Sequence, residues 1–379
     1  MLGRSWCPCR RDAGITDAVA TRSLCREPSA VPPRPPVLRT CFAEGYGRGW
    51  CDSRETPAFY PVLVLNPLLQ TLPALVVPAS DATPDLPRFT VGTIFTQWGI
   101  DPILFVVTVW VAGLYLVGVW MLRHRGDAWP VGRTLAFVVG GMGSFYFATQ
   151  SGLSAYDTTL LSAHMVQHMI LSMVVPLFLA LGAPVTLALR TLPSSPRGVL
   201  MALLHSRLAK VLTFAPLTLA LYIASPWALY FSGWYSASLH HTFVHELMHV
   251  HLVLVGSLFF WPLMGIDPLP GRLQYPFRLL MIFLTLPFHA FLGVTIMSQS
   301  KLIGGDWYPN LHRTMSWLPD PLDDQHVAGG ILWSSGDLIG LLFFAVLFVQ
   351  WVRASMQEAK REDRRLDRLE RQQRTAPGG

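Results

Sequence analysis

Two histidine pairs with the same spacing carry the most specific chemistry in this chain. His164 and His168 lie in HMVQHM, and His245 and His249 lie in HELMH. A step of four residues places two side chains on one face of a helix, roughly 6 Å apart along its axis. Imidazole binds copper, zinc and iron well, and it is costly to place in lipid without a function. The spacing therefore predicts a metal or haem site with ligands from two helices.

Two other interpretations of the histidines compete with metal handling. HELMH matches the H-E-x-x-H pattern of zinc proteases, in which Glu246 would activate water. Site-2-type membrane proteases also carry a later Asp in an NPDG-like or LDG-like context, whereas Asp267 lies in GIDPLPG and Asp337 in SSGDL. A haem-binding electron carrier or a haem-modifying enzyme is the second alternative, because histidines on facing helices can ligate haem. The histidine-rich segments offer no complete catalytic set, so we expect a protein that is not an enzyme.

The elements that must position these residues are apolar helices. The chain is 51% hydrophobic and 14% charged, and several apolar runs reach the roughly 20 residues that span a bilayer. We expect an all-α, multi-pass protein of the bacterial cell membrane, with the lipid bilayer as its surroundings. The net charge of +6 does not indicate nucleic acid, because the basic residues cluster in loops and the tail. Seven transmembrane helices are expected at about 102–122, 132–150, 166–188, 210–231, 243–264, 278–298 and 328–351.

Arginine and lysine concentrate in alternate loops between these spans. The positive-inside rule places such loops in the cytoplasm. The first span then begins outside, and the carboxyl terminus is cytoplasmic. Both histidine pairs fall at the outer ends of their spans, the third and the fifth. The basic residues that set this orientation are Arg123, Arg125, Arg133, Arg190, Arg197, Arg207, Lys210, Arg272 and Arg278.

We expect four parts along the chain. Residues 1–58 form a disordered or wrongly assigned N-terminal extension, rich in Arg, Pro and Gly. Residues 59–94 are apolar but interrupted by proline, which favours a leader-like or re-entrant segment. Residues 95–352 form the seven-helix domain, and 353–379 form a charged cytoplasmic tail. Thiolate ligands are excluded from the helical domain, because all five cysteines precede it: Cys7, Cys9, Cys25, Cys41 and Cys51.

Other residues near the predicted site are open to two interpretations. Met165, Met169 and Met248 lie beside the histidines, and thioether with imidazole suits Cu(I), although Met also fills gaps in apolar cores. Asp337 falls about three turns into the seventh span, where an ionisable side chain is a functional candidate. It could instead be a hydrogen-bonded structural acid.

The third and fifth spans carry a family resemblance. HMVQHMILSMVVPLFLALGAPVTLALR and HHTFVHELMHVHLVLVGSLFFWPLMGIDPLP resemble the CtaG family, multispan cytochrome c oxidase assembly factors of Gram-positive bacteria and actinobacteria. The resemblance covers roughly residues 95–352. It implies that the protein assists oxidase maturation, with cytochrome c oxidase subunits as partners and a copper ion delivered to the metal centres. Some members are fused to CopD-type copper domains; this chain ends shortly after its seventh span, and we expect none in it.

The resemblance also implies a ligand set for copper. It carries over His164, His168, His245 and His249, with His241 one turn before His245. Glu246 and Asp337 are weaker companions of this set.

Overall fold

The structure is a computed structural model that divides the chain into two compact units, Met1–Leu75 and Val76–Gly379. Each unit is described by itself. The described residues are 41–42, 50–51, 86–270 and 273–375.

The first unit contains a short strand pair. Strand β1 (Cys41–Phe42) pairs antiparallel with β2 (Trp50–Cys51), so that Cys41 lies opposite Cys51. The rest of the predicted extension 1–58, and most of the predicted leader-like segment 59–94, lie outside the described residues. Both expectations therefore stay predictions.

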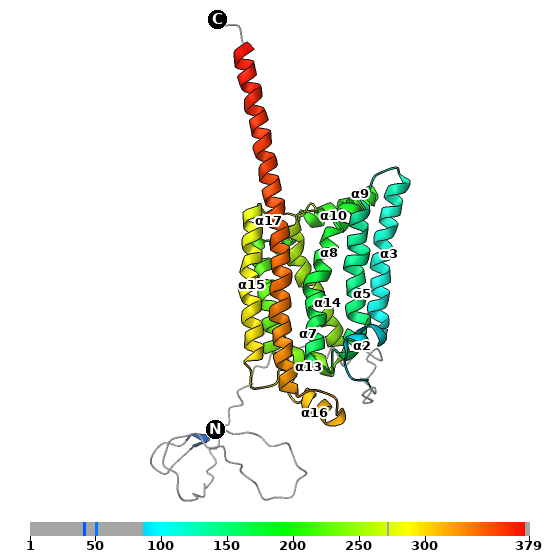
Figure 1. The fold of residues 1–379 in the computed structure, drawn as a ribbon. Helices are drawn as coiled ribbons and strands as arrows, with labels where there is room; N and C mark the ends of the chain where they lie inside the picture. The colour runs from blue at the N-terminus through cyan, green and yellow to red at the C-terminus, as the bar shows by residue number, and fades with distance from the viewer. Residues whose placement is uncertain (1–40, 43–49, 52–85, 271–272, 376–379) are drawn as a thin grey trace, which may run out of the picture. The chain divides into compact units, whose positions relative to one another are not determined.

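The second unit is a bundle of helices (Figure 1). Two of its segments, η2 and η3, are π-helical and interrupt longer α-helices. The elements are α2 (Val91–Thr96), α3 (Pro102–His124), α4 (Val131–Leu135), η2 (Ala136–Met142), α5 (Gly143–Gln150), α6 (Gly152–Tyr156), α7 (Leu161–Met169), η3 (Ile170–Val174), α8 (Val175–Leu181), α9 (Pro184–Thr191), α10 (Ser194–Leu204), α11 (Arg207–Leu212), α12 (Ala215–Phe231), α13 (Gly233–His240), α14 (Thr242–Met264), α15 (Tyr275–Met297), α16 (Trp307–Thr314) and α17 (Pro321–Thr375).

Five helical segments are long and apolar enough to cross a membrane, which confirms the predicted all-α membrane class. They are α3, the run from α7 to α9, α14, α15 and most of α17. The other two predicted spans are also helical. The second is built from α4, η2 and α5, and the fourth contains the 17-residue α12. Seven crossings and their orientation stay predictions.

The surface of the bundle is as apolar as a bilayer requires. On α3, for example, Ile103, Val106, Trp110, Val117 and Trp120 are exposed. Such side chains would contact lipid tails, because the tails are themselves apolar and no hydrophobic effect drives the side chains into the bundle. The buried interior instead contains histidine, aspartate and glutamine side chains. The polar chemistry of this unit is therefore inside the bundle.

A glycine allows the two histidine-bearing helices to approach each other closely. On α14, His245, His249, Leu252 and Gly256 are all buried, and their spacing places them on one helix face. A Cβ atom on Gly256 would lie 2.2 Å from the Ser172 carbonyl oxygen of η3. Small residues of this kind allow close backbone packing in membranes. Gly256 thus fixes the histidine face of α14 against the helix that carries the other pair.

The start of α7 is also tied to α17. The Ser162 backbone N–H and hydroxyl donate to the Asp324 carboxylate, at 3.2 and 2.5 Å. Helix α17 then runs without a break through the last predicted span and the charged tail, extending beyond the other helices (Figure 1). These two hydrogen bonds fix the start of α7 against α17, and with it the position of His164.

Asp267 holds together the far ends of the two histidine-bearing segments, the run from α7 to α9 and helix α14. Its carboxylate accepts from the Thr186 N–H (2.7 Å), the Thr186 hydroxyl (2.5 Å), the Val185 N–H (3.3 Å) and Trp261 Nε1 (2.8 Å). Asp267 thus caps the start of α9 from the loop after α14. Figure 1 shows α9 and α10 at the end of the bundle away from α13 and α16. The GAPVT and GIDP segments are therefore two halves of one structural clamp.

Candidate metal centre

The two histidine pairs meet inside the bundle. Within the pairs, the ring centroids of His164 and His168 are 3.8 Å apart, and those of His245 and His249 are 4.5 Å apart. Between helices, His164 lies 5.6 Å from His245 and His168 lies 6.3 Å from His249. All four side chains are buried. We call these four residues the histidine cluster.

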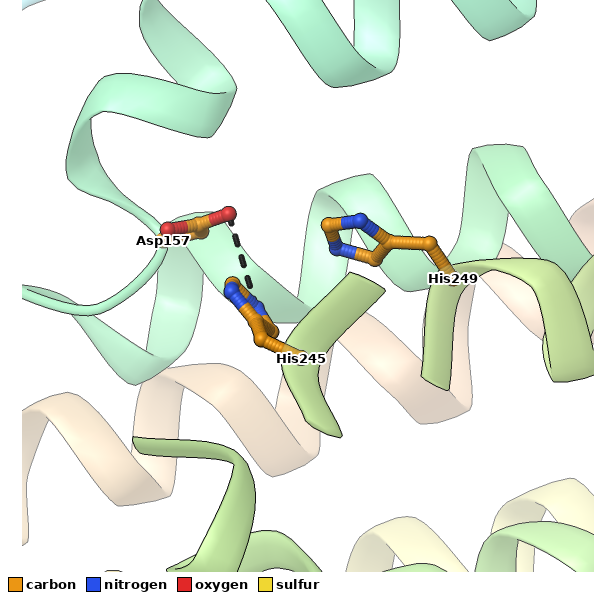
Figure 2. Close-up of side chains that lie close together, drawn as sticks. All are labelled: Asp157, His245 and His249. Carbon is orange, nitrogen blue, oxygen red and sulfur yellow. Dashed lines mark ion pairs between the residues drawn. The ribbon is translucent and has the colours of Figure 1, made fainter. Parts of the chain in front are cut away.

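Asp157 joins the histidine cluster from the loop between α6 and α7. Its Oδ2 atom lies 3.6 Å from His245 Nε2. One ligand atom each from Asp157, His245 and His249 lie within 4.8 Å of one another (Figure 2). Sequence analysis did not name Asp157 as a ligand. The available signal was a carboxylate seven residues before His164, at the same end of the span.

Gln167 connects the carboxylate to the histidines. Its Nε2 donates to Asp157 Oδ2 at 3.1 Å and to the Ala148 carbonyl at 3.0 Å. Its Oε1 lies 3.3 Å from His249 Nε2. Gln167 therefore orients one acid and one imidazole together, as outer residues of metal sites commonly do. This residue was also missed by sequence analysis, although it stands inside HMVQHM.

Tyr230 fixes the orientation of His168, the second histidine of α7. His168 Nδ1 lies 2.7 Å from the Tyr230 hydroxyl of α12, and that hydroxyl donates to Met165 Sδ at 3.4 Å. With its hydrogen directed at sulfur, the hydroxyl accepts from His168 Nδ1–H. This bond leaves the lone pair of His168 on Nε2.

Several ring nitrogens of the cluster have no partner. Among the residues that the structure describes, none hydrogen-bonds to either nitrogen of His164, to His168 Nε2 or to His245 Nε2. A buried polar atom without a partner costs about 1–3 kcal/mol. Cation binding would remove the part of this cost that falls on the lone pairs, because lone pairs of neutral imidazoles are good ligands. The donor set thus fits a metal that takes nitrogen and oxygen, such as copper or zinc.

The charge of Asp157 is also sensitive to its surroundings. Burial raises the pKa of Asp157 to about 7, and the Coulombic effect of His249 and the Gln167 hydrogen bond offset only part of this rise. A cation beside the carboxyl group would favour its ionised form. A metal bound beside Asp157 would therefore meet a carboxylate that it helps to ionise.

The remaining predicted site residues lie outside this arrangement or at its edge. Glu246 is partly buried, with Oε2 3.4 Å from His249 Nδ1. His241 is exposed at the N-cap of α14, and Asp337 lies on α17 with an Oδ1 atom that has no partner among the described residues. Within the described part of the chain, no side-chain hydrogen bond or ring contact joins His241 or Asp337 to the histidine cluster; His241 is linked to it only through the helix backbone, where its carbonyl accepts from the His245 N–H at 3.1 Å.

The geometry also bears on the protease interpretation of HELMH. Asp267 follows the far end of α14, roughly 30 Å from His245 at 1.5 Å per residue, and its carboxylate is occupied by the clamp. The residues that lie beside His245 and His249 are His164 and His168, not Asp267. HELMH is therefore half of a site built by two helices.

Comparison with known proteins assigns the family. The model of the cytochrome c oxidase caa3 assembly factors (Caa3_CtaG) matches residues 113–354. The chain belongs to this family. The match covers the histidine cluster, Asp157 and the Asp267 clamp, and it confirms the resemblance to CtaG proteins. No solved structure matches the chain.

Curated relatives of this Caa3_CtaG protein come from mycobacteria. Uncharacterized proteins of Mycobacterium bovis and Mycobacterium tuberculosis are each 39% identical over 285 residues, and one of Mycobacterium leprae is 35% identical over 291 residues. The alignments cover 73–75% of this chain and 43% of each relative. The chain thus spans less than half the length of the curated relatives it matches.

Proposed function

We propose that this chain is an assembly factor that holds a copper ion at the histidine cluster and passes it to a cytochrome c oxidase during maturation. The family supports a role in oxidase assembly. The observation that carries the copper site is the meeting of four buried histidines with Asp157, with ring nitrogens left unpartnered. Copper is the cargo here, so the protein needs no catalytic activity of its own.

The donor set favours copper over harder ions. Imidazole nitrogen dominates it, with one carboxylate, and imidazole ligands suit copper. His164, His245, His249 and Asp157 are the groups that would hold the ion, with His168 beside them. Carboxylate-rich sites suit magnesium and calcium instead.

The surrounding residues support holding and release. Gln167 orients Asp157 and His249, and Tyr235 packs edge-on against His164, with ring centroids 5.1 Å apart. Burial excludes competing water from the ion. His245 lies in the first turn of α14 and is the least buried of the four. It is the ligand best placed for transfer to a partner, at the end of the bundle that the positive-inside rule predicts to face outward.

Copper binding to the purified protein tests this proposal. The full chain in detergent is titrated with copper against a chromophoric chelator, alongside His245→Ala/His249→Ala and the control His205→Ala, an exposed histidine. We expect a more than 100-fold loss of affinity in the double variant, since the loss of two residues that bind the ion directly exceeds the 10–100-fold effect of residues around the ligands. The control should bind as the wild type does.

Oxidase maturation in cells provides the second half of the test. Cells that lack the gene are complemented with each variant, and the copper centres of the oxidase are measured spectroscopically. The double variant should leave these centres depleted. Full copper occupancy of the oxidase with the double variant, together with unchanged copper affinity in vitro, would refute the proposed function.

A further inference from the structure

A small cavity lies beside the histidine cluster, deeper in the bundle. Its volume is about 40 Å³, enough for roughly three waters at 10–15 Å³ each. Residues of α7, η3, α12, α14, α15 and α17 line it. The side chains with donor atoms that matter here are Met165, His168, Met169, Tyr222, Tyr230 and His289.

One face of α7 supplies soft donors to this cavity. Met165, His168 and Met169 all line it, at the spacing that places residues on one helix face. Met165 Sδ lies 3.4 Å from the Tyr230 hydroxyl, which lies 2.7 Å from His168 Nδ1. A thioether and an imidazole thus approach the same phenol.

A further imidazole lines the cavity from α15. The Nδ1 of His289 is 3.1 Å from the Thr285 carbonyl, which can only accept, so Nδ1 donates and the lone pair is on Nε2. The ring packs against Tyr222, with centroids 5.7 Å apart. His289 therefore offers a ligand nitrogen from a helix that contributes nothing to the histidine cluster.

Two buried polar atoms on the cavity wall have no partner. His168 Nε2 and the Tyr222 hydroxyl accept and donate no hydrogen bond within the described residues. Both side chains are almost fully buried. Such atoms favour a bound ligand in the cavity, because a buried polar atom without a partner lowers the stability of the fold.

We propose that this cavity is a second metal site, in which Met165, Met169, His168 and His289 bind Cu(I). Thioether ligands select Cu(I) over zinc, whereas the histidine cluster offers nitrogen and oxygen. His168 lies between the two sites, and its single lone pair, on Nε2, serves the cavity when both sites are filled. The inference rests on the proposed function only for copper as the cargo; the cavity and its donors stand on their own geometry.

X-ray absorption and copper analysis of the Cu(I)-loaded full chain test the second site, first in the wild type and then in a variant of the histidine cluster. The wild type should hold two equivalents of Cu(I), with both Cu–S and Cu–N scattering. His164→Ala/His245→Ala should lose one equivalent and retain the sulfur-bound one. If the histidine cluster binds no copper, the wild type holds one sulfur-bound equivalent, and only the proposed function fails. One equivalent without Cu–S scattering would overturn the second site, since the cavity then holds water alone.

Methionine variants locate the sulfur ligands. Met165→Leu/Met169→Leu changes side-chain volume little, so the variant should keep the fold. It should lose the Cu–S scattering and one equivalent of Cu(I). The matched control is Met173→Leu, a buried methionine of η3 outside the cavity lining. Equal Cu(I) content in the two variants would also overturn the proposal.

Discussion

The two ends of the α7–α9 and α14 pair bury polar side chains in opposite ways. At one end, the Asp267 carboxylate accepts four hydrogen bonds and joins α9 to the loop after α14. At the other end, four histidines meet Asp157, and several ring nitrogens are left without a partner in the described structure. A satisfied polar group stabilises the fold, whereas an unsatisfied one costs free energy. The Asp267 end thus has the properties of a structural joint, and the histidine end those of a binding site.

Removal of the Asp267 carboxylate should give the largest effect on stability. Asp267→Ala leaves the Thr186 and Trp261 donors without an acceptor, which lowers the free energy of unfolding by about 1–3 kcal/mol for each group. We expect a marked fall in the thermal unfolding midpoint in detergent, with the copper affinity of the folded fraction unchanged. Asp323→Ala, at an exposed acid, is the control. A variant as stable as the wild type would contradict the structural role.

A side chain at Gly256 should disturb the close packing of α14 against η3, on which both the fold and the histidine cluster depend. Gly256→Ala places a Cβ 2.2 Å from the Ser172 carbonyl oxygen, so α14 must move away from η3, at about 1–3 kcal/mol. We expect lower stability and weaker copper binding together, since the histidine pairs separate. Gly113→Ala, where nothing lies within 4 Å of the new Cβ, should leave both measurements unchanged. Thermal unfolding and copper titration of the two variants check this.

The buried glutamines should separate binding from stability. Gln167→Ala removes the donor to Asp157 and should weaken copper binding about 10–100-fold. Gln150 is also buried, but its Oε1 accepts from the Asp101 N–H at 2.8 Å, so Gln150→Ala should lower stability with the affinity intact. Isothermal titration and thermal unfolding distinguish them. Equal copper affinities would mean that Gln167 has no orienting role.

The smallest change concerns the stability of the metal-free protein. His164→Leu replaces a ring with two unpartnered nitrogens by an apolar side chain, a change that is nearly neutral or stabilising. With a chelator present, its unfolding midpoint should equal or exceed that of the wild type. The stabilisation by added copper should be lost, because binding to the native state alone provides it.

His241 is the matched control for His164. It is exposed at the N-cap of α14, and surface changes usually stay within about 0.5 kcal/mol. His241→Ala should keep both the stability of the metal-free protein and its copper-induced stabilisation. A large loss of stability in His164→Leu without metal would mean that the histidine end is a structural joint as well.

The sequence by itself determined the class of the protein and its two candidate helices. Apolar length predicts membrane helices, and a four-residue step predicts a shared helix face, because both depend on local backbone geometry. The motifs also pointed to the family. These features need no knowledge of how the helices pack.

Only the tertiary structure decided which residues share the site. Gln167 and His249 are 82 positions apart, and Asp157 reaches them from a loop whose path no local pattern specifies. The same packing assigns Asp267 to a clamp and leaves His241 at the surface. Contacts of this kind depend on close approach at positions such as Gly256, and helix periodicity within one segment holds no information about that approach.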